Sequence, residues 1–357
     1  MKQIHVNLGK DSYDIQIEKG LLDHVGAALR KVIQARTLAV ISDDTVDGLY
    51  GGRLERSLQE NGFTVRRMVF PAGESSKSLR MLANLYQGMA DAGLTRSDAV
   101  ITFGGGVTGD LGGFAAATYL RGIPFIQIPT TIIAQVDSSV GGKVAVDLPS
   151  GKNQAGSFYQ PKAVFIDPEL LQTLPIRFIH DGMGEVIKYG CIRDRSLFEL
   201  LETVDDNSLP AYWEEIIGRC CAIKAAIVER DVFDLGERMI LNFGHTIGHA
   251  VERYYSYGCY THGEGVAVGM AMLTCRTEAM GLTQIGTAER IIRLLKRYSL
   301  PAAVRASASD LLPYIGHDKK KRGSRLTFII LKKIGVCELL PVAGEDIPHY
   351  IRKREFI

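Results

Sequence analysis

The sequence lacks the features that mark secreted, membrane-spanning and nucleic-acid-binding proteins. Its six cysteines include no CxxC pair, no run of about 18 apolar residues occurs, and the opening MKQIHVNLGK has no apolar h-region. A net charge of +2 leaves no basic excess that would attract nucleic acid or an anionic membrane surface. We therefore expect a cytoplasmic protein with reduced thiols and without a nucleic-acid or membrane partner.

The first part of the chain alternates two kinds of pattern, and no internal repeat or low-complexity tract interrupts it. Apolar, β-branched runs lie at 37–42, 63–70, 98–103 and 123–129, and helical patterns lie between them at 45–60, 78–92 and 107–118. This alternation predicts an α/β domain with a parallel, Rossmann-like sheet over residues 1–172.

Long amphipathic stretches dominate after residue 172. They cover 175–190, 211–230, 238–256, 263–280 and 286–298, and a late pair of apolar runs at 325–331 and 335–341 predicts a hairpin. Because 357 residues are long for a single core, we expect a second, mainly helical domain over residues 173–357. No linker separates the two patterns, so we expect the active site in the interdomain cleft.

The stretch GGGVTGD follows one of the predicted strands and precedes a predicted helix. Gly104, Gly106 and Gly109 satisfy the pattern G-x-G-x-x-G, in which a helix N-terminus receives a pyrophosphate. The acidic residue expected about 20 positions later is absent, although Asp43 and Asp44 end an earlier strand and could accept ribose hydroxyls. The alternative is that these glycines serve only helix packing.

A second polar loop, PAGESSKS, also follows a predicted strand. Glu74 and Lys77 could contact a nucleotide, or Ser76 or Ser78 could cap the next helix. Taken alone, the pattern favours capping.

The stretch ILNFGHTIGHA carries two of eight histidines, and a third follows within 18 residues in THGEG. In a helix, His245 and His249 would lie on one face. Glu185 stands on an otherwise apolar helical pattern and needs a cation, which is either Lys188 or a metal. One glutamate and two histidines suit a catalytic zinc site. Three interpretations stay open: both residues of the pair bind one metal, one binds metal while the other moves protons, or both are packed.

Basic and polar residues that could surround a multiply anionic small molecule are spread over both predicted domains. They are Arg121, Asp137, Lys143, Lys152, Asn153, Lys188, Lys224, Arg238 and the run HDKKKR at 317–322. Any single lysine is more often a solvated surface residue, but Lys224 and Arg238 have apolar neighbours, which argues against a pure surface role.

Seven motifs, in order and over about residues 38 to 340, resemble those of the 3-dehydroquinate synthase family. They are GESSKS, GGGVTGDLGGFAAATYLRGIPFIQIPTT, VDSSVGGKVAVDLPSGKN, GMGEVIKYG, NFGHTIGHAVE, HGEGVAVGM and DKK. The resemblance implies the shikimate-pathway lyase that converts 3-deoxy-D-arabino-heptulosonate 7-phosphate to 3-dehydroquinate and phosphate. It also implies catalytic NAD, a divalent metal (Zn2+, with Co2+ as the alternative) and a homodimer.

The resemblance further implies roles for individual residues. The implied metal ligands are Glu185, His245 and His262. The implied substrate-site residues are Asp137, Lys143, Lys152, Asn153, Lys188, Lys224, Asp234, Arg238, Asn242 and His249. One lysine of the pair Lys319 and Lys320 also belongs to this set, and we take it to be Lys320. Arg121 is implied to reach the substrate site of the neighbouring subunit. The implied NAD contacts are Asp43, Glu74, Lys77, Gly105, Gly106, Asp110, Thr130, Thr131, Lys143, Lys152 and Thr173.

The implied chemistry explains this set. NAD removes hydride from a ring alcohol that the metal polarises, and phosphate leaves once the neighbouring C–H is acidified. Hydride then returns, the ring opens and an internal aldol step closes the carbocycle, without net redox change. Lysines and Asn153 would hold the phosphate, Lys224 and Arg238 the carboxylate, and His249 would serve as hydrogen-bond donor or proton carrier.

Two positions depart from the family pattern. Asp234, in DVFD, stands where a glutamate usually contacts a substrate hydroxyl, and Thr45 stands where asparagine is frequent near the ribose. Alternative functions are a related sugar-phosphate cyclase with a carboxylate-free product, a metal-dependent polyol dehydrogenase, and a non-catalytic binding protein. Arg238 and Asn242 argue against the first, and the many phosphate-directed lysines argue against the second. The complete set of ligands and anion-binding residues argues against the third.

Overall fold

The computed structural model describes residues 1–315 and 325–351, and the chain divides into two compact units. The first unit comprises Met1–Leu174 and Trp213–Phe233, and the second comprises Pro175–Tyr212 and Asp234–Ile357. Among the described helices, none is long and apolar enough to cross a bilayer.

The first unit is built on a seven-stranded sheet with the order β1-β2-β9-β6-β5-β3-β4. Its strands are β1 (Lys2–Val6), β2 (Tyr13–Ile17), β3 (Thr37–Asp43), β4 (Thr64–Phe70), β5 (Ala99–Gly104), β6 (Phe125–Pro129) and β9 (Ala163–Ile166). Only β1 and β2 pair antiparallel, and the remaining pairs are parallel. The four strands predicted in this region match β3 to β6, which confirms the parallel α/β fold.

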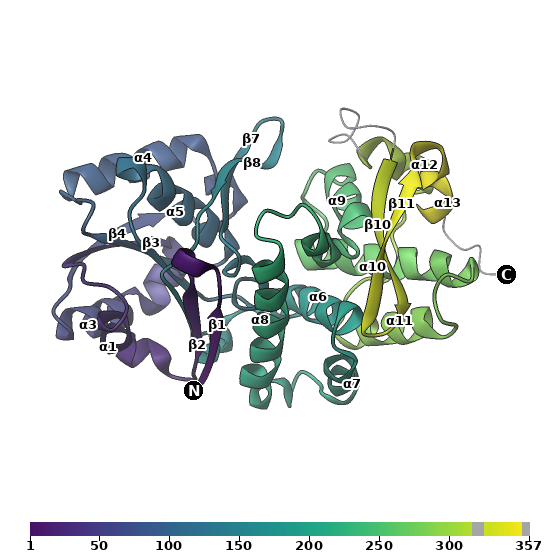
Figure 1. The fold of residues 1–357 in the computed structure, drawn as a ribbon, viewed down its shortest axis with the longest axis horizontal. Coiled ribbons are helices and arrows are strands. Elements are labelled where there is room, and N and C mark those ends of the chain that lie inside the picture. The colour runs from purple at the N-terminus through teal and green to yellow at the C-terminus, as the bar shows by residue number, and fades with distance from the viewer. Residues whose placement is uncertain (316–324, 352–357) are drawn as a thin grey trace. The chain divides into compact units, whose positions relative to one another are not determined.

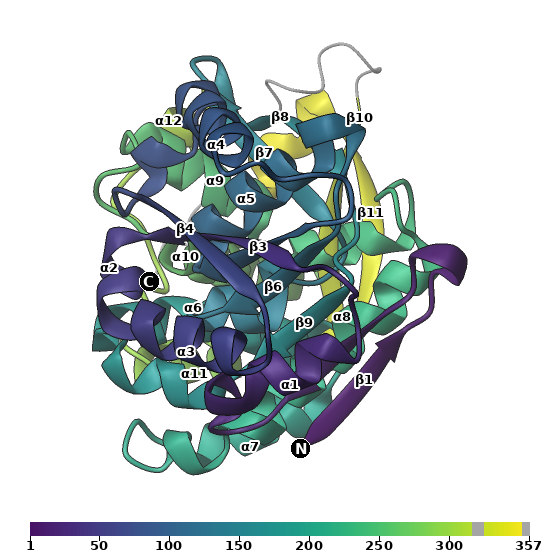
Figure 2. The ribbon, with the colours of Figure 1, turned by 90° about the vertical axis from the view of Figure 1, so that its left-hand side faces the viewer.

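Helices cover both faces of this sheet (Figures 1 and 2). They are α1 (Val25–Arg30), α2 (Asp44–Val46), α3 (Gly52–Glu60), α4 (Leu79–Asp91) and α5 (Gly106–Thr118). Alternate side chains of each central strand point to opposite faces, so Val40 packs with α1 and α3 whereas Ile41 packs with α4 and α5. Because both faces of the sheet are covered, every residue of β5 is buried.

Helix α8 (Trp213–Arg230) corrects the predicted domain division, because it belongs to the first unit although it lies beyond residue 172. Its contacts are with β1, β2 and the turn at Ala134–Ser138. The buried Cys221 on this helix donates its thiol hydrogen to the carbonyl oxygen of Gln135 at 3.2 Å. Amphipathicity predicted that the helix exists, but it does not encode which surface the helix covers.

The glycines of the segment 135–153 predict a loop, but the segment contains most of a two-stranded hairpin. Strands β7 (Lys143–Leu148) and β8 (Gly151–Phe158) pair antiparallel. β7 packs on α5, where Val144 contributes to the core. The alternation of polar and apolar residues in KVAVDL is typical of a strand, but the preceding glycines made the segment resemble a loop.

The second unit is mainly helical, as predicted. Its helices are α6 (Ile176–Ile192), α7 (Arg195–Thr203), α9 (His245–Tyr254), α10 (His262–Ala279), α11 (Thr287–Arg297), α12 (Ala308–Leu311) and α13 (Ile347–Ile351). The predicted late hairpin is present as β10 (Arg325–Lys333) and β11 (Val336–Ala343), which pair antiparallel.

The predicted helix at 238–256 is broken in the structure. Residues Glu237–Asn242 form a 3-10 turn, Gly244 adopts φ 81°, and the α-helix begins only at His245. A Cβ on Gly244 would lie 2.6 Å from the carbonyl oxygen of Val266 on α10, so close helix contact and chain reversal both require glycine here. Arg238 and Asn242 therefore lie on the turn before α9 and not on the edge of one continuous helix.

Candidate active site and metal centre

The predicted nucleotide contacts gather where parallel strands of the first unit end. Asp43 closes β3, Gly105 and Gly106 follow β5, and Thr130 and Thr131 follow β6. In open α/β sheets, ligands bind outside these carboxyl ends. Glu74 and Lys77 follow β4, Asp110 lies in the second turn of α5, and Thr173 ends the 3-10 turn after β9, where its hydroxyl meets Tyr50 Oη at 2.7 Å.

The start of α5 has the properties of an anion site. Gly105 is its N-cap residue, and its first turn contains no acidic residue, so its backbone N–H groups and positive dipole end favour an anion. A Cβ on Gly105 would lie 3.2 Å from Thr131 Cγ2, and a Cβ on Gly106 would lie 3.2 Å from Ser138 Oγ. Thr130 Oγ1 is buried and has no hydrogen-bond partner among the described residues. The open backbone and this hydroxyl fit a pyrophosphate-bearing cofactor.

Other glycines of α5 serve packing, so the packing interpretation holds at their positions. A Cβ on Gly109 would lie 2.7 Å from Gln127 Oε1, and a Cβ on Gly113 would lie 2.5 Å from Val144 Cγ1. These contacts hold α5 against the sheet and the β7–β8 hairpin.

Lys77 and Asp110 form a nearly buried ion pair, with Nζ 2.6 Å from Oδ2. Burial lowers the pKa of Lys77, but the carboxylates of Asp110 and Glu74 outweigh it and raise the pKa above its ordinary value. The ammonium is therefore charged at neutral pH. The capping interpretation also holds, because Ser78 Oγ accepts from the backbone N–H of Met81 at the start of α4.

Asp43 also has a structural role. Its Oδ1 accepts from the backbone N–H groups of Thr45 and Val46 and caps α2, while its Oδ2 accepts from the hydroxyl of Thr108 at 3.3 Å. The Thr45 departure thus leaves the backbone part of this turn in place.

Two predicted substrate lysines of the first unit, Lys224 and Lys152, pair with nearby carboxylates. Lys224 Nζ on α8 lies 2.8 Å from Asp137 Oδ1 and donates to the carbonyl oxygen of Asp137 at 2.5 Å. Lys152 Nζ lies 3.3 Å from a Glu74 oxygen. The exposed Lys143 begins β7.

Three predicted site residues adopt left-handed backbone conformations: Arg121 (φ 69°), Asn153 (φ 56°) and Asp234 (φ 58°). Asparagine and aspartate tolerate this region, whereas for arginine it costs about 1–2 kcal/mol. Such strain concentrates at functional sites.

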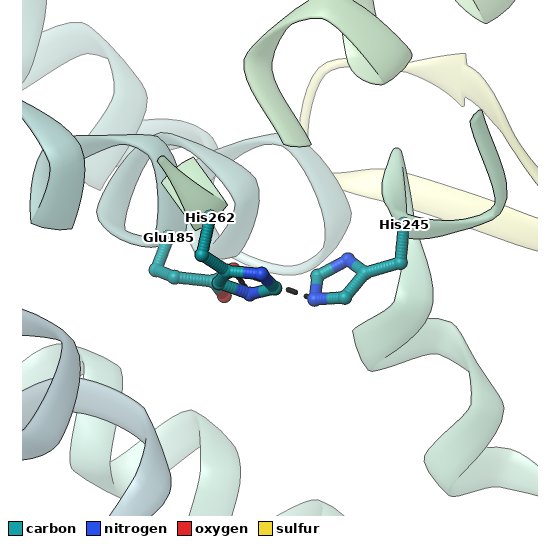
Figure 3. Close-up of side chains that lie close together, drawn as sticks. All are labelled: Glu185, His245 and His262. Carbon is teal, nitrogen blue, oxygen red and sulfur yellow. Dashed lines mark ion pairs between the residues drawn. The ribbon is translucent and has the colours of Figure 1, made fainter. Parts of the chain in front are cut away.

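The three predicted metal ligands converge from three helices of the second unit (Figure 3). Glu185 of α6 places Oε1 at 3.4 Å from His245 Nε2 of α9 and at 3.3 Å from His262 Nε2 of α10. All three ligand atoms lie within 4.8 Å of one another. Ligand atoms about 2.0–2.1 Å from a tetrahedral zinc lie roughly 3.3 Å apart, so the observed spacing fits such an ion.

The protonation chemistry of this cluster also fits a divalent cation. Burial lowers the pKa of His245 to about 3, so its imidazole is neutral; its Nδ1 lies 3.1 Å from the carbonyl oxygen of Phe243, which leaves Nε2 as a lone-pair donor. For His262, the hydrogen bonds with Glu185 and Glu252 outweigh burial and raise the pKa to about 10. The carboxylates therefore demand a cation at this place, whether proton or metal. Lys188 donates a hydrogen bond to Glu185 Oε2, the oxygen that does not face the histidines.

Of the remaining predicted residues of the second unit, His249 lies beside this cluster. His249, one turn after His245 on α9, is exposed, and its ring centroid lies 5.4 Å from that of His245 and 5.8 Å from that of His262. Arg238 is 2% exposed. Lys319 and Lys320 lie outside the described residues.

Sequence reasoning missed two buried carboxylates beside the cluster. Glu252 Oε1 lies 3.2 Å from His262 Nδ1, and Asp181 Oδ1 accepts from the backbone N–H of Gly263 at 2.6 Å. Glu252 could have been found, because it lies seven residues after His245 and three after His249, on the same helical face.

Comparison with known proteins gives one consistent relationship. Residues 67–181 match the family described as 3-dehydroquinate synthase N-terminal, and residues 182–321 match its C-terminal counterpart. A 3-dehydroquinate synthase of Clostridium acetobutylicum is 50% identical over 99% of both chains. One of Enterococcus faecalis is 45% identical over 98% of this chain and 99% of the other.

Solved structures extend the likeness to other cyclases. A 2-deoxy-scyllo-inosose synthase complexed with carbaglucose-6-phosphate, NAD+ and Co2+ is 27% identical, covers 98% of this chain and 99% of its own, and has a TM-score of 0.88. A 2-epi-5-epi-valiolone synthase from Streptomyces hygroscopicus with NAD+ and Zn2+ is 25% identical over 96% of both chains, with a TM-score of 0.85. A glycerol dehydrogenase from Schizosaccharomyces pombe, 17% identical over 94% of this chain and 87% of its own, with a TM-score of 0.64, shares the fold alone.

Proposed function

The chain belongs to the 3-dehydroquinate synthase family, and from this membership we propose that it converts 3-deoxy-D-arabino-heptulosonate 7-phosphate to 3-dehydroquinate and phosphate. The observation that carries the proposal is the 50% identity over 99% of both chains with a relative of that activity. The cyclases with other products share the fold but only about half of that identity, 25–27%.

The residues present fit two cofactors. Glu185, His245 and His262 would hold a divalent metal, zinc or cobalt, and the start of α5 with Thr130 and Thr131 would hold the pyrophosphate side of NAD. When bound, NAD would exchange a hydride with a ring alcohol, and the metal would polarise that oxygen.

The protein's own groups would orient the substrate and handle its charges. Lys152 and Asn153 would hold the phosphate, and Lys224 and Arg238 the carboxylate, arginine through its planar fork. Placing the phosphate oxygens beside the acidified carbon lets the leaving group itself take the proton. His249, which is exposed one turn from His245, would donate a hydrogen bond or carry a proton at the ring oxygens.

The test is an assay of the purified protein with the heptulosonate phosphate, zinc and NAD at catalytic amounts, which follows phosphate and NADH together. We expect phosphate release without NADH accumulation, because the hydride returns within one turnover. NADH formed in proportion to substrate, without phosphate, would indicate a dehydrogenase. A sugar phosphate without a carboxylate serves as the control substrate, and its preferred turnover would indicate another cyclase.

We also propose that the protein is a cytoplasmic homodimer without a nucleic-acid partner, in which Arg121 serves the neighbouring subunit's site. Arg121 is exposed and strained, which supports a role outside its own fold. The test mixes two inactive variants, Arg121→Ala and His249→Ala, after joint refolding. If Arg121 acts across the dimer, each mixed dimer regains one intact site and activity returns. If it acts within its own subunit, the mixture stays inactive.

A further inference from the structure

His262 has both ring nitrogens engaged by carboxylates, and only one of these carboxylates belongs to the set of three ligands. Its Nε2 lies 3.3 Å from Glu185 Oε1, and its Nδ1 lies 3.2 Å from Glu252 Oε1. Glu252 belongs to α9 and is 4% exposed. A carboxylate so deeply buried is costly without a hydrogen-bonded partner, and the ring of His262 is the partner that the structure supplies.

The fold reserves the space that Glu252 occupies. A Cβ on Gly265 would lie 3.2 Å from both Cγ and Oε1 of Glu252, and 3.1 Å from the carbonyl oxygen of Gly248. A side chain at position 265 would therefore crowd Glu252, which would have to shift by a few tenths of an ångström. The first turn of α10 thus presents His262 and, three residues later, leaves room for the group that holds its ring.

The hydrogen bond has a defined chemical effect on the ring. When Nδ1 carries the proton and donates it to Glu252, the lone pair of Nε2 points to Glu185 and His245. A carboxylate acceptor also makes the imidazole a stronger electron donor than a neutral acceptor does. His245 differs in this respect, because its Nδ1 faces the carbonyl oxygen of Phe243. The two histidines are held by acceptors of different strength.

We propose that Glu252 is a positioning residue that orients His262 and strengthens it as a ligand of the divalent metal, without binding the metal itself. The inference rests on the proposed function for the presence of that metal. A competing arrangement exists, since ligand atoms of His249, Glu252 and His262 also lie within 4.8 Å of one another. The geometry favours the first arrangement, because Glu185 is completely buried and its Oε1 lies 3.4 Å from His245 Nε2 and 3.3 Å from His262 Nε2.

The test measures metal affinity of the apo protein without substrate, by competition with a chromophoric chelator for Zn2+ and by titration with Co2+. We expect Glu252→Ala and Glu252→Gln to weaken binding about 10- to 100-fold, and Glu252→Asp to recover part of the loss. The visible Co2+ spectrum of these variants should keep the wild-type band positions, because the ligand atoms are unchanged. Glu278→Gln is the matched control, since Glu278 lies on the same helix as His262 and accepts only from the backbone of Ala288 in the contacts described.

Three results would overturn the inference. The first is a Glu252→Ala variant with native circular dichroism and unchanged affinity. The second is a Co2+ spectrum that changes with Glu252→Gln but not with Glu185→Gln, which would place the ion at the competing site. The third is a wild-type protein that binds no divalent metal, which would remove the metal from the proposed function as well. Wild-type binding with an unaffected Glu252 variant, by contrast, leaves the proposed function intact.

Discussion

At the scale of single residues, His245 and His249 lie one turn apart on α9 but have different surroundings. His245 is 8% exposed and faces Glu185, whereas His249 is exposed. A four-residue spacing predicts a shared face and nothing about depth, so the sequence pattern alone left the roles of the pair open.

We predict that His245→Ala loses the metal, while His249→Ala keeps it and loses turnover by at least about 100-fold, the usual contribution of a positioned proton carrier. Metal content by atomic absorption after gel filtration, beside the phosphate-release rate, checks both. Loss of metal in both variants would show that the division of roles is wrong.

A second residue-scale prediction concerns Asp98, which is buried just before β5. It accepts from the backbone N–H groups of Thr37 and Thr95 at 3.0 and 2.8 Å, and from the Thr95 hydroxyl at 2.8 Å. Burial raises its pKa, but these hydrogen bonds outweigh burial and hold the pKa below its ordinary value. The stabilisation is therefore fully present above the unfolded pKa of about 3.9 and is lost as pH falls through the lower folded value.

Asp98→Ala should lower the free energy of unfolding by about 1–3 kcal/mol at pH 7. Urea unfolding of the first unit at pH 7 and near pH 3.5 measures the change, and its size should shrink at the lower pH. Asp98→Asn is the control, because its side-chain amide keeps one acceptor oxygen and does not ionise in this pH range. A difference from wild type that stays constant with pH would contradict the assignment.

At the scale of elements, glycines let α6, α9 and α10 approach closely enough for their side chains to meet. A Cβ on Gly184 would lie 2.7 Å from the carbonyl oxygen of Gly263, one on Gly248 would lie 2.8 Å from that of Gly265, and one on Gly269 would lie 1.9 Å from that of Gly244. Gly244 and Gly248 of NFGHTIGHA therefore allow the close contact between α9 and α10. Their partners on α10 could not be predicted, because pairing between helices is a tertiary choice.

Gly269→Ala should therefore separate α9 from α10, lower the stability of the second unit by about 1–3 kcal/mol and weaken metal binding although residue 269 is no ligand. Thermal unfolding and chelator competition measure the two effects. The matched control is Gly52→Ala in α3, where a Cβ meets nothing within 4 Å and alanine should gain up to about 1 kcal/mol. Unchanged metal affinity in Gly269→Ala would contradict the role of this contact.

The limits of sequence reasoning at this scale are physical. Period and length identified β3 to β6, α4 to α6, α10 and the late hairpin. They missed the break at Gly244, because an amphipathic sequence pattern does not reveal whether a glycine within it adopts a helical or a left-handed backbone conformation. They also missed β1, β2 and the β7–β8 hairpin, whose short alternations resemble loops when many glycines and polar residues surround them.

At the scale of the whole molecule, neither of the two compact units is formed by one contiguous stretch of the chain. Helix α8 is flanked in sequence by segments of the second unit but packs in the first. The first unit therefore cannot be completed by a contiguous N-terminal piece, and the chain crosses between the units three times.

This division predicts which unit loses stability when a buried side chain of α8 is shortened. Ile217→Ala, at a completely buried position, should cost about 2–5 kcal/mol and reduce amide hydrogen-exchange protection in β1 and β2 more than in α10. Ile247→Ala on α9 is the matched control, with the opposite distribution. Equal loss of protection in both units for both variants would mean that the units unfold as one.

The three predicted metal ligands also join distant parts of the chain, because Glu185 and His262 belong to helices that are separated in sequence by α7, α8 and α9. An ion held only by the folded arrangement adds RT ln(1 + [M]/Kd) to stability, about 2.7 kcal/mol at a free concentration 100 times Kd. Chelation should accordingly lower the melting temperature of the wild type but not of His245→Ala, which differential scanning calorimetry would detect. A cell short of zinc would then lose this protein through faster turnover of the polypeptide, so that metal supply sets enzyme abundance as well as enzyme activity.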